Sequence, residues 1–116
     1  MGTEDIGIVY CLSNPSFNSD YTGKTMVKIG MTRKDDVKER MKELYTTGVP
    51  TPFVCEIAMQ VENPASVEHK LQTLFSANRV ASNREFFNVN PYDVEIALSL
   101  TGGMDVTPER PFSDDF

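Results

Sequence analysis

Short apolar runs alternate with polar stretches rich in Gly, Pro, Asn and Ser along this chain. Runs with the apolar or alternating pattern of β-strands cover residues 6–12, 26–32, 53–60 and 85–89. Runs with apolar residues at helical spacing cover residues 35–46, 63–78 and 91–100. This order of elements predicts an α+β fold in which helices cover a small, mostly antiparallel sheet.

The run over residues 26–32 combines a clear strand pattern with unusual polar positions. Val27 and Ile29 lie on one face, whereas Lys28 and Gly30 lie on the other. A glycine inside a strand often marks a place where a ligand or another backbone comes close. Lysine also occurs on exposed strand faces, so the pattern alone does not decide between a structural and a functional role for Lys28.

The length and composition of the chain are those of one globular domain. Of its 116 residues, 40% are hydrophobic and 24% are charged. No apolar run reaches the roughly 18 residues of a membrane span, and the N-terminus is acidic where a secretory signal would be basic. We therefore expect a cytoplasmic protein with no membrane partner.

The charge of the chain is unevenly distributed. A net charge of −6 argues against tight non-specific binding to a phosphate backbone. Residues 24–42, however, contain seven basic and three acidic side chains, a local balance of +4. Residues 101–116 have a local balance of −3, and we expect them to form an acidic, flexible tail. The overall negative charge thus leaves room for a basic surface that binds nucleic acid.

The sequence contains few cysteine and histidine residues from which a site could be built. Cys11 and Cys55 are too few for a disulfide scaffold or a four-ligand zinc site, and both lie in apolar runs, where a buried thiol is ordinary. His69 is the single histidine, which excludes metal motifs with several histidines. A catalytic site would therefore depend mainly on other residue types.

Four polar side chains occupy positions that simple solvation does not explain. Tyr10 lies inside the first apolar run, where a buried hydroxyl needs a partner. Glu68 lies at the edge of the apolar stripe of the second helix, where a carboxylate is costly without a partner or an ion. Arg40 flanks the stripe of the first helix, and Lys28 lies beside Gly30. Taken singly, each has an ordinary explanation as a core or boundary residue.

Taken together, these residues resemble the GIY-YIG endonuclease superfamily. The resemblance rests on the strand motifs Gly7-Ile8-Val9-Tyr10 and Lys28-Ile29-Gly30, followed by Arg40 and Glu68 on the two helices. Two longer strings are closer still to its phage open-reading-frame subgroup, which is related to the Mug113-type domains. They are Val27-Lys28-Ile29-Gly30-Met31-Thr32 and Arg84-Glu85-Phe86-Phe87. The resemblance covers residues 7–89.

This resemblance implies a small three-stranded antiparallel sheet flanked by helices, to which the pattern adds a short edge strand and a C-terminal helix. One domain would comprise residues 1–100, followed by the tail over residues 101–116. The implied activity is hydrolysis of phosphodiester bonds in DNA with one divalent cation, Mg²⁺ or Mn²⁺. RNA as the substrate, a homo-oligomer and a targeting partner all remain open.

By the same resemblance, four residues would be catalytic. Glu68 would bind the metal, and Arg40 would bind the scissile phosphate. Tyr10 would orient or deprotonate the attacking water, although a phenol is a weak base at neutral pH without positive charge nearby. Lys28 replaces the tyrosine of the second motif, and it would neutralise phosphate or lower the pKa of Tyr10.

Other basic side chains are expected to face the nucleic acid, namely Lys24, Arg33, Lys34, Lys38, Arg79 and Arg84. The asparagine that usually follows the metal-binding glutamate has no clear counterpart, and Glu85 or Asn88 would occupy that region. Two functions are consistent with the sequence. The joint presence of the motif residues favours a metal-dependent endonuclease. The negative charge and the lysine in the second motif favour a catalytically weak or inactive module that binds nucleic acid or another protein.

Overall fold

The computed structural model describes residues 5–17, 23–80 and 85–108. In chain order its elements are β1 (Ile6–Ser13), β2 (Thr25–Thr32), α1 (Val37–Leu44), β3 (Val54–Glu62), α2 (Pro64–Leu74), a 3-10 helix (Ser76–Asn78), β4 (Phe86–Val89), α3 (Pro91–Ser99) and β5 (Met104–Asp105). Each strand and helix expected from the sequence is present. Within the described ranges, no helix is long and apolar enough to cross a membrane.

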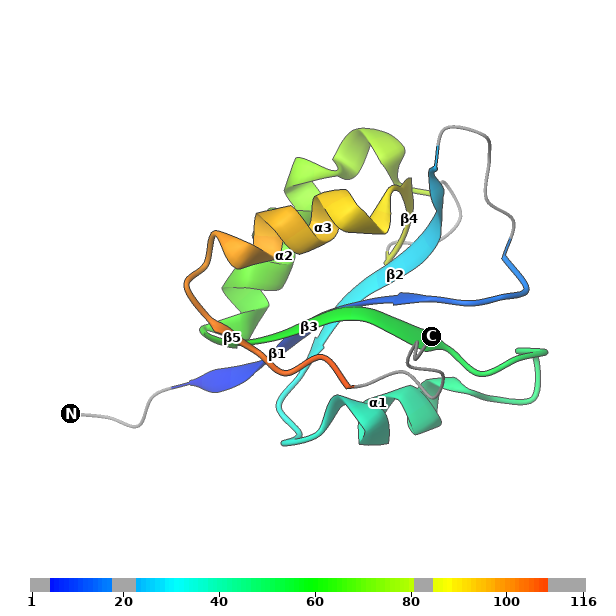
Figure 1. Cartoon of the computed structure of the whole chain (residues 1–116), viewed down its shortest axis with the longest axis horizontal. Helices are drawn as coiled ribbons and strands as arrows, with labels where there is room; N and C mark the ends of the chain where they lie inside the picture. The colour runs from blue at the N-terminus through cyan, green and yellow to red at the C-terminus, as the bar shows by residue number, and fades with distance from the viewer. Residues whose placement is uncertain (1–4, 18–22, 81–84, 109–116) are drawn as a thin grey trace, which may run out of the picture.

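The strands form one sheet in the order β4-β2-β1-β3-β5, with every neighbouring pair antiparallel (Figure 1). β1, β2 and β3 form the expected centre, and β4 is the expected short edge strand. The expected strand count is nevertheless wrong, because β5 adds a second edge beside β3 and makes the sheet five-stranded. Two residues are too few to produce a periodic pattern, so only the pairing with Met59 and Gln60 reveals β5.

Helices cover both faces of this sheet. α2 and α3 lie against one face, and α1 lies against the other (Figure 1). Because strand residues alternate between faces, Val9 and Cys11 of β1 pack on the α2 and α3 side, whereas Ile8, Tyr10 and Leu12 pack on the α1 side. Tyr10 therefore belongs to the core beneath α1.

Local sequence signals determine where the helices begin. The side chain of Asp36 accepts a hydrogen bond of 2.9 Å from the backbone N–H of Lys38 and caps α1. Asn90 caps α3 in the same way, through the N–H of Tyr92. Pro64 occupies the first position of α2, where the missing N–H costs nothing. These caps place α1 and α3 within one or two residues of the expected starts.

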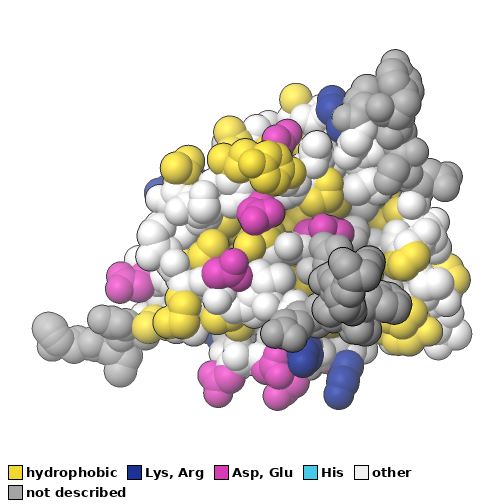
Figure 2. Space-filling view, viewed as in Figure 1, with side chains coloured by type: hydrophobic (Ala, Val, Ile, Leu, Met, Phe, Trp, Pro, Cys, Tyr) yellow, Lys and Arg dark blue, Asp and Glu magenta, His cyan; other side chains and the backbone are white. Residues whose placement is uncertain are grey.

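The buried sides of α2 and α3 differ from the expected apolar stripes. Leu71 of α2 is buried, but Leu74, expected in the same stripe, is 65% exposed. On α3, Val94 and Leu98 are buried one turn apart, and Leu100 is 82% exposed. Figure 2 shows the resulting group of hydrophobic side chains over the outside of α3. In short helices rich in apolar residues, only contact with the sheet decides which residues are buried.

The first part of the expected tail returns to the sheet. The N–H of Val106 donates to the carbonyl of Ala58 at 2.9 Å, and the Thr107 hydroxyl accepts from the Ala58 N–H at 3.0 Å. Val106 is half-buried against the core on the α1 side. Residues 109–116, the remainder of the expected tail, lie outside the described residues.

Candidate functional site

Tyr10 and Gly30 face each other across β1 and β2 at the centre of the site. The two residues are paired in the antiparallel register, and Tyr10 is 1% exposed. A Cβ atom on residue 30 would lie 2.7 Å from the Tyr10 hydroxyl oxygen. Gly30 therefore makes room for the phenol ring of Tyr10. The glycine in this strand suggested that another group comes close to it. That group is the side chain of Tyr10 on the neighbouring strand.

Arg40 reaches this phenol from α1. Its Nε donates a hydrogen bond of 3.2 Å to the Tyr10 hydroxyl oxygen. Burial raises the pKa of Tyr10, and this effect outweighs the lowering by Arg40. Tyr10 is therefore protonated at neutral pH, so it has a proton to donate and is a poor base.

Lys28 lies on the same face of β2, two residues before Gly30. Its side chain is 8% exposed, and its ammonium forms an ion pair with the carboxylate of Glu85. The same ammonium lies 5.3 Å from the centre of the Phe86 ring, a distance suited to a cation–π contact. Glu85 comes immediately before β4, whose Phe86 pairs with Lys28. Glu85 thus supplies the counter-charge that a buried lysine requires.

Glu68 approaches the same cluster from α2. The helix is fixed to the edge of β2, because Gln72, one turn after Glu68, donates to the carbonyl of Ile29 at 3.1 Å. The N–H of Ile29 donates to the carbonyl of Glu85 at 3.0 Å. α2 and the segment before β4 therefore meet at one residue of β2, just beyond the last residue that β4 pairs.

The electrostatics of Glu68 show which charges surround it. Burial raises the pKa of its carboxyl group most, and the negative charge of Glu85 raises it further, whereas Lys28 and His69 oppose both effects. The charges of Glu68 and Glu85 also raise the pKa of Tyr10. All four predicted catalytic residues are thus brought into one neighbourhood, together with Glu85.

The sequence marked Glu85 only as one of two residues in a region. Asn88, the alternative, is exposed on β4 and pairs with Met26, farther from Gly30 along β2. An acidic residue directly before the edge strand was the available signal. This signal identifies Glu85 as the partner of Lys28 only when it is known that β4 pairs with β2.

The other predicted basic residues are distributed over several elements. Arg33 donates to both carboxylate oxygens of Asp5, at 2.9 and 3.1 Å. Lys34 forms a 3.1 Å ion pair with Glu43. Lys24 and Lys38 are exposed.

Two predicted basic residues come from the segment that connects α2 to β4. Arg79 lies 5.2 Å from the ring centre of Phe87, after the 3-10 helix. Arg84 lies outside the described residues. Lys34 shares a partner with a predicted catalytic residue, since Glu43 also binds Arg40.

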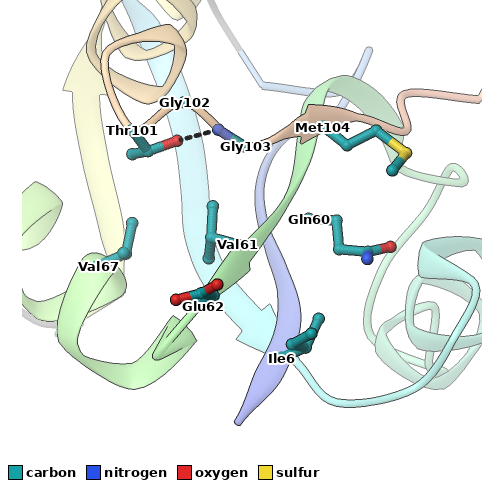
Figure 3. Close-up of a pocket in the computed structure, with 9 residues that line it drawn as sticks. All are labelled: Ile6, Gln60, Val61, Glu62, Val67, Thr101, Gly102, Gly103 and Met104. Atoms are coloured by element: carbon teal, nitrogen blue, oxygen red, sulfur yellow. Dashed lines mark hydrogen bonds between the residues drawn. The ribbon is translucent and has the colours of Figure 1, made fainter. Parts of the chain in front are cut away.

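One hollow of the described structure lies apart from the predicted catalytic residues. This hollow, of about 430 Å³, opens between the end of β3 and the loop before β5. Its lining consists of Ile6, Gln60, Val61, Glu62, Val67, Thr101, Gly102, Gly103 and Met104, and it contains no predicted catalytic residue (Figure 3). This hollow is therefore not part of the candidate site.

The donor atoms of the site favour particular metals. Within the described residues, no group of three or more His, Cys, Asp or Glu side chains comes together. This donor set does not fit a zinc site with three or four protein ligands. Mg²⁺ and Mn²⁺ are held by one or two carboxylates and retain several waters, and Glu68 is a carboxylate of this kind, with the charge of Glu85 acting on it.

The close approach at Gly30 leads to a prediction about stability. Gly30→Ala should lower the free energy of unfolding by about 1–3 kcal/mol, because the new Cβ displaces the buried ring of Tyr10. Gly48→Ala is the control, since a Cβ there meets nothing within 4 Å. Urea unfolding followed by circular dichroism measures both, and equal midpoints for the two variants would contradict the proposed packing.

The ion pair of Lys28 with Glu85 predicts that removing either partner changes the stability by a different amount. Glu85→Gln should destabilise the fold by about 1–3 kcal/mol, because it leaves a buried ammonium without its counter-charge. Lys28→Met should cost less, because the apolar stem is kept and Glu85 remains half exposed. Thermal and urea unfolding of the two variants test this order, and a larger loss for Lys28→Met would refute it.

Comparison with known proteins identifies one family. The model of the T5orf172 domain matches residues 7–101, which include every predicted catalytic residue. No curated protein and no solved structure matches the chain. The match agrees with the resemblance to a domain of phage open reading frames, and its family is compatible with a nuclease-like or DNA-binding role. The chain belongs to the T5orf172 domain family.

Proposed function

We propose that this chain is a metal-dependent endonuclease of the GIY-YIG type that hydrolyses phosphodiester bonds in DNA. The observation that carries the proposal is the hydrogen bond between Arg40 and Tyr10 beside Gly30. It joins residues from three separate motifs, and the Arg40 side chain is 34% exposed. Glu68 and Lys28 adjoin them from two further directions.

Glu68 would hold a Mg²⁺ or Mn²⁺ ion, and Glu85, whose charge acts on Glu68, would assist through a bound water. Burial and a neighbouring carboxylate both disfavour the charged form of Glu68, and a cation would relieve both effects. When bound, such an ion stabilises developing charge and lowers the pKa of a bound water. The protein residues then have to supply orientation and further positive charge.

Arg40 is suited to binding the scissile phosphate. Its Nε is occupied by Tyr10 and its Nη1 by Glu43, but a guanidinium has five N–H donors in a planar fork. The remaining donors would contact non-bridging phosphate oxygens. The fixed charge of Arg40 would stabilise the transition state, where negative charge on the phosphate increases.

Tyr10 would orient the attacking water. Because burial raises its pKa, the phenol remains protonated at neutral pH and can donate a hydrogen bond. Of the two roles that the resemblance implies for this residue, orientation of the water is therefore the one proposed. Lys28, held by Glu85, would add positive charge near the phosphate without acting as a base.

The second candidate function is binding of nucleic acid without turnover. The ion pair between Lys28 and Glu85 favours it, because this lysine occupies the tyrosine position of the second motif and its charge already has a partner. Both functions predict binding at the same surface, and only the first predicts cleavage.

A cleavage assay separates the two functions. Purified protein should relax and cut plasmid DNA with Mg²⁺ or Mn²⁺, and Glu68→Gln should reduce the rate at least about 100-fold because the metal is no longer held. Arg40→Ala should reduce the rate to a similar degree while Mn²⁺ affinity, measured by calorimetry, stays near the wild-type value. Binding of DNA without cleavage by the wild type would instead support the second function.

The raised pKa of Glu68 predicts how metal binding depends on pH. The protonated carboxyl does not attract a cation, so Mn²⁺ affinity should fall as pH decreases through this pKa, starting above the ordinary glutamate value of 4.5. Glu85→Gln removes a negative neighbour and should move the loss of affinity to lower pH. Calorimetric titration with Mn²⁺ across the acidic range tests both statements, and an unmoved profile in Glu85→Gln would contradict the coupling.

A further inference from the structure

Glu43 binds two basic side chains of the candidate surface at once. Its Oε1 accepts from Nη1 of Arg40 at 3.0 Å, and its Oε2 lies 3.1 Å from Nζ of Lys34. Arg40 and Glu43 are three residues apart on α1, and Lys34 comes from the loop that precedes this helix. We call Lys34 and Arg40 the two-cation cradle. The carboxylate of Glu43 occupies this cradle with both of its oxygens.

A carboxylate held in this way makes the contacts that a phosphate could make. Both groups present anionic oxygens to a pair of cationic donors. The three side chains are between 34% and 45% exposed, so a polymer can reach them from solvent. We infer that the two-cation cradle binds a phosphodiester group of a nucleic acid backbone, and that the carboxylate of Glu43 competes with this phosphate for Lys34 and Arg40. This inference rests on the proposed action on DNA.

The position of the cradle connects it to the candidate site. Arg40 binds Tyr10 through Nε and Glu43 through Nη1, so one side chain belongs to both. Lys34 also lines a hollow of about 330 Å³, together with Arg33, Asp35, Gln60 and residues 6–8. A nucleic acid strand with one phosphate at the site can therefore place a neighbouring phosphate in the cradle and continue over this hollow.

Electrostatics indicate that Glu43 is a persistent but weak competitor. The hydrogen bonds from Lys34 and Arg40 lower the pKa of its carboxyl group, so it is ionised throughout the neutral range. Ion pairs between exposed side chains contribute little, and phosphate can displace this one at small cost. Asp5 pairs with Arg33 nearby in the same manner, so a phosphate that contacts Arg33 would also have to displace a carboxylate.

The test compares two substitutions that change the charge equally. Affinity for a short DNA duplex is measured by fluorescence anisotropy in EDTA, so that no cleavage occurs. Glu43→Gln should bind about threefold to tenfold more tightly than the wild type and depend more steeply on salt, by about one additional phosphate contact. Glu39→Gln, on the same helix, is the control, because Glu39 forms no ion pair with any described residue. It should change affinity less than about twofold.

Several outcomes would overturn the inference. Equal gains in both variants would show a general effect of charge, and weaker binding by Glu43→Gln would show that Glu43 merely positions Arg40. Absence of DNA binding by either protein would reject the cradle outright. Inorganic phosphate is titrated in parallel, and tighter binding of it than of the duplex would identify a site for free phosphate instead of nucleic acid.

Two further measurements keep this inference separate from the proposed activity. Lys34→Gln removes half of the cradle and should weaken duplex binding, which tests the cradle even if Glu43→Gln folds poorly. Cleavage of the same duplex with Mn²⁺ reports on the proposed activity alone. If the duplex is not cleaved but Glu43→Gln still binds it more tightly, the endonuclease is rejected and the cradle is retained. If the duplex is cleaved but Glu43→Gln does not bind it more tightly, the cradle is rejected and the endonuclease is retained.

Discussion

A buried phenol that must find a hydrogen-bond donor or acceptor organises this structure. Tyr10 lies in the core beneath α1, and its ring fits there because Gly30 leaves the opposite position on β2 empty. Arg40 satisfies the hydroxyl group and thereby links α1 to the central strands. The guanidinium can do this only from the edge of the core, where its other donors remain accessible. One packing requirement thus places a cation at the surface with a fixed orientation.

A second constraint is the buried charge of Lys28. An ammonium inside a sheet requires a carboxylate, and Glu85 supplies it from the residue before β4. The backbone of Glu85 also accepts from Ile29, whose own carbonyl is bound by Gln72 of α2. Satisfying one buried lysine therefore brings the edge strand and α2 to the same point. Glu68 reaches the cluster because it lies one turn from Gln72 on that helix.

Ion pairs with carboxylates neutralise several of the basic side chains that were predicted to be functional. Four ion pairs between described residues each join a carboxylate to a residue predicted to contact nucleic acid or to act in catalysis. The carboxylates are those of Asp5, Glu43 and Glu85, and Glu43 takes part in two of the pairs. Under the proposed function, such a surface would attract phosphate only where several contacts form together. It would therefore favour an extended polymer over a single small anion, since a polymer can replace several carboxylates at once.

Local pattern was sufficient for β1–β4 and for the three helices to within a few residues, because alternation and helical spacing act between near neighbours in the chain. The motif order also identified Tyr10, Lys28, Arg40 and Glu68 as residues that belong together. Tertiary structure alone decided the rest: the pairing of β5, the burial of Leu98 instead of Leu100, the partner of Lys28, which is 57 residues away, and the two cations bound by Glu43. Each of these depends on strand register or on the rotation of a helix against the sheet. Packing between distant segments determines these features, so a local sequence pattern does not predict them.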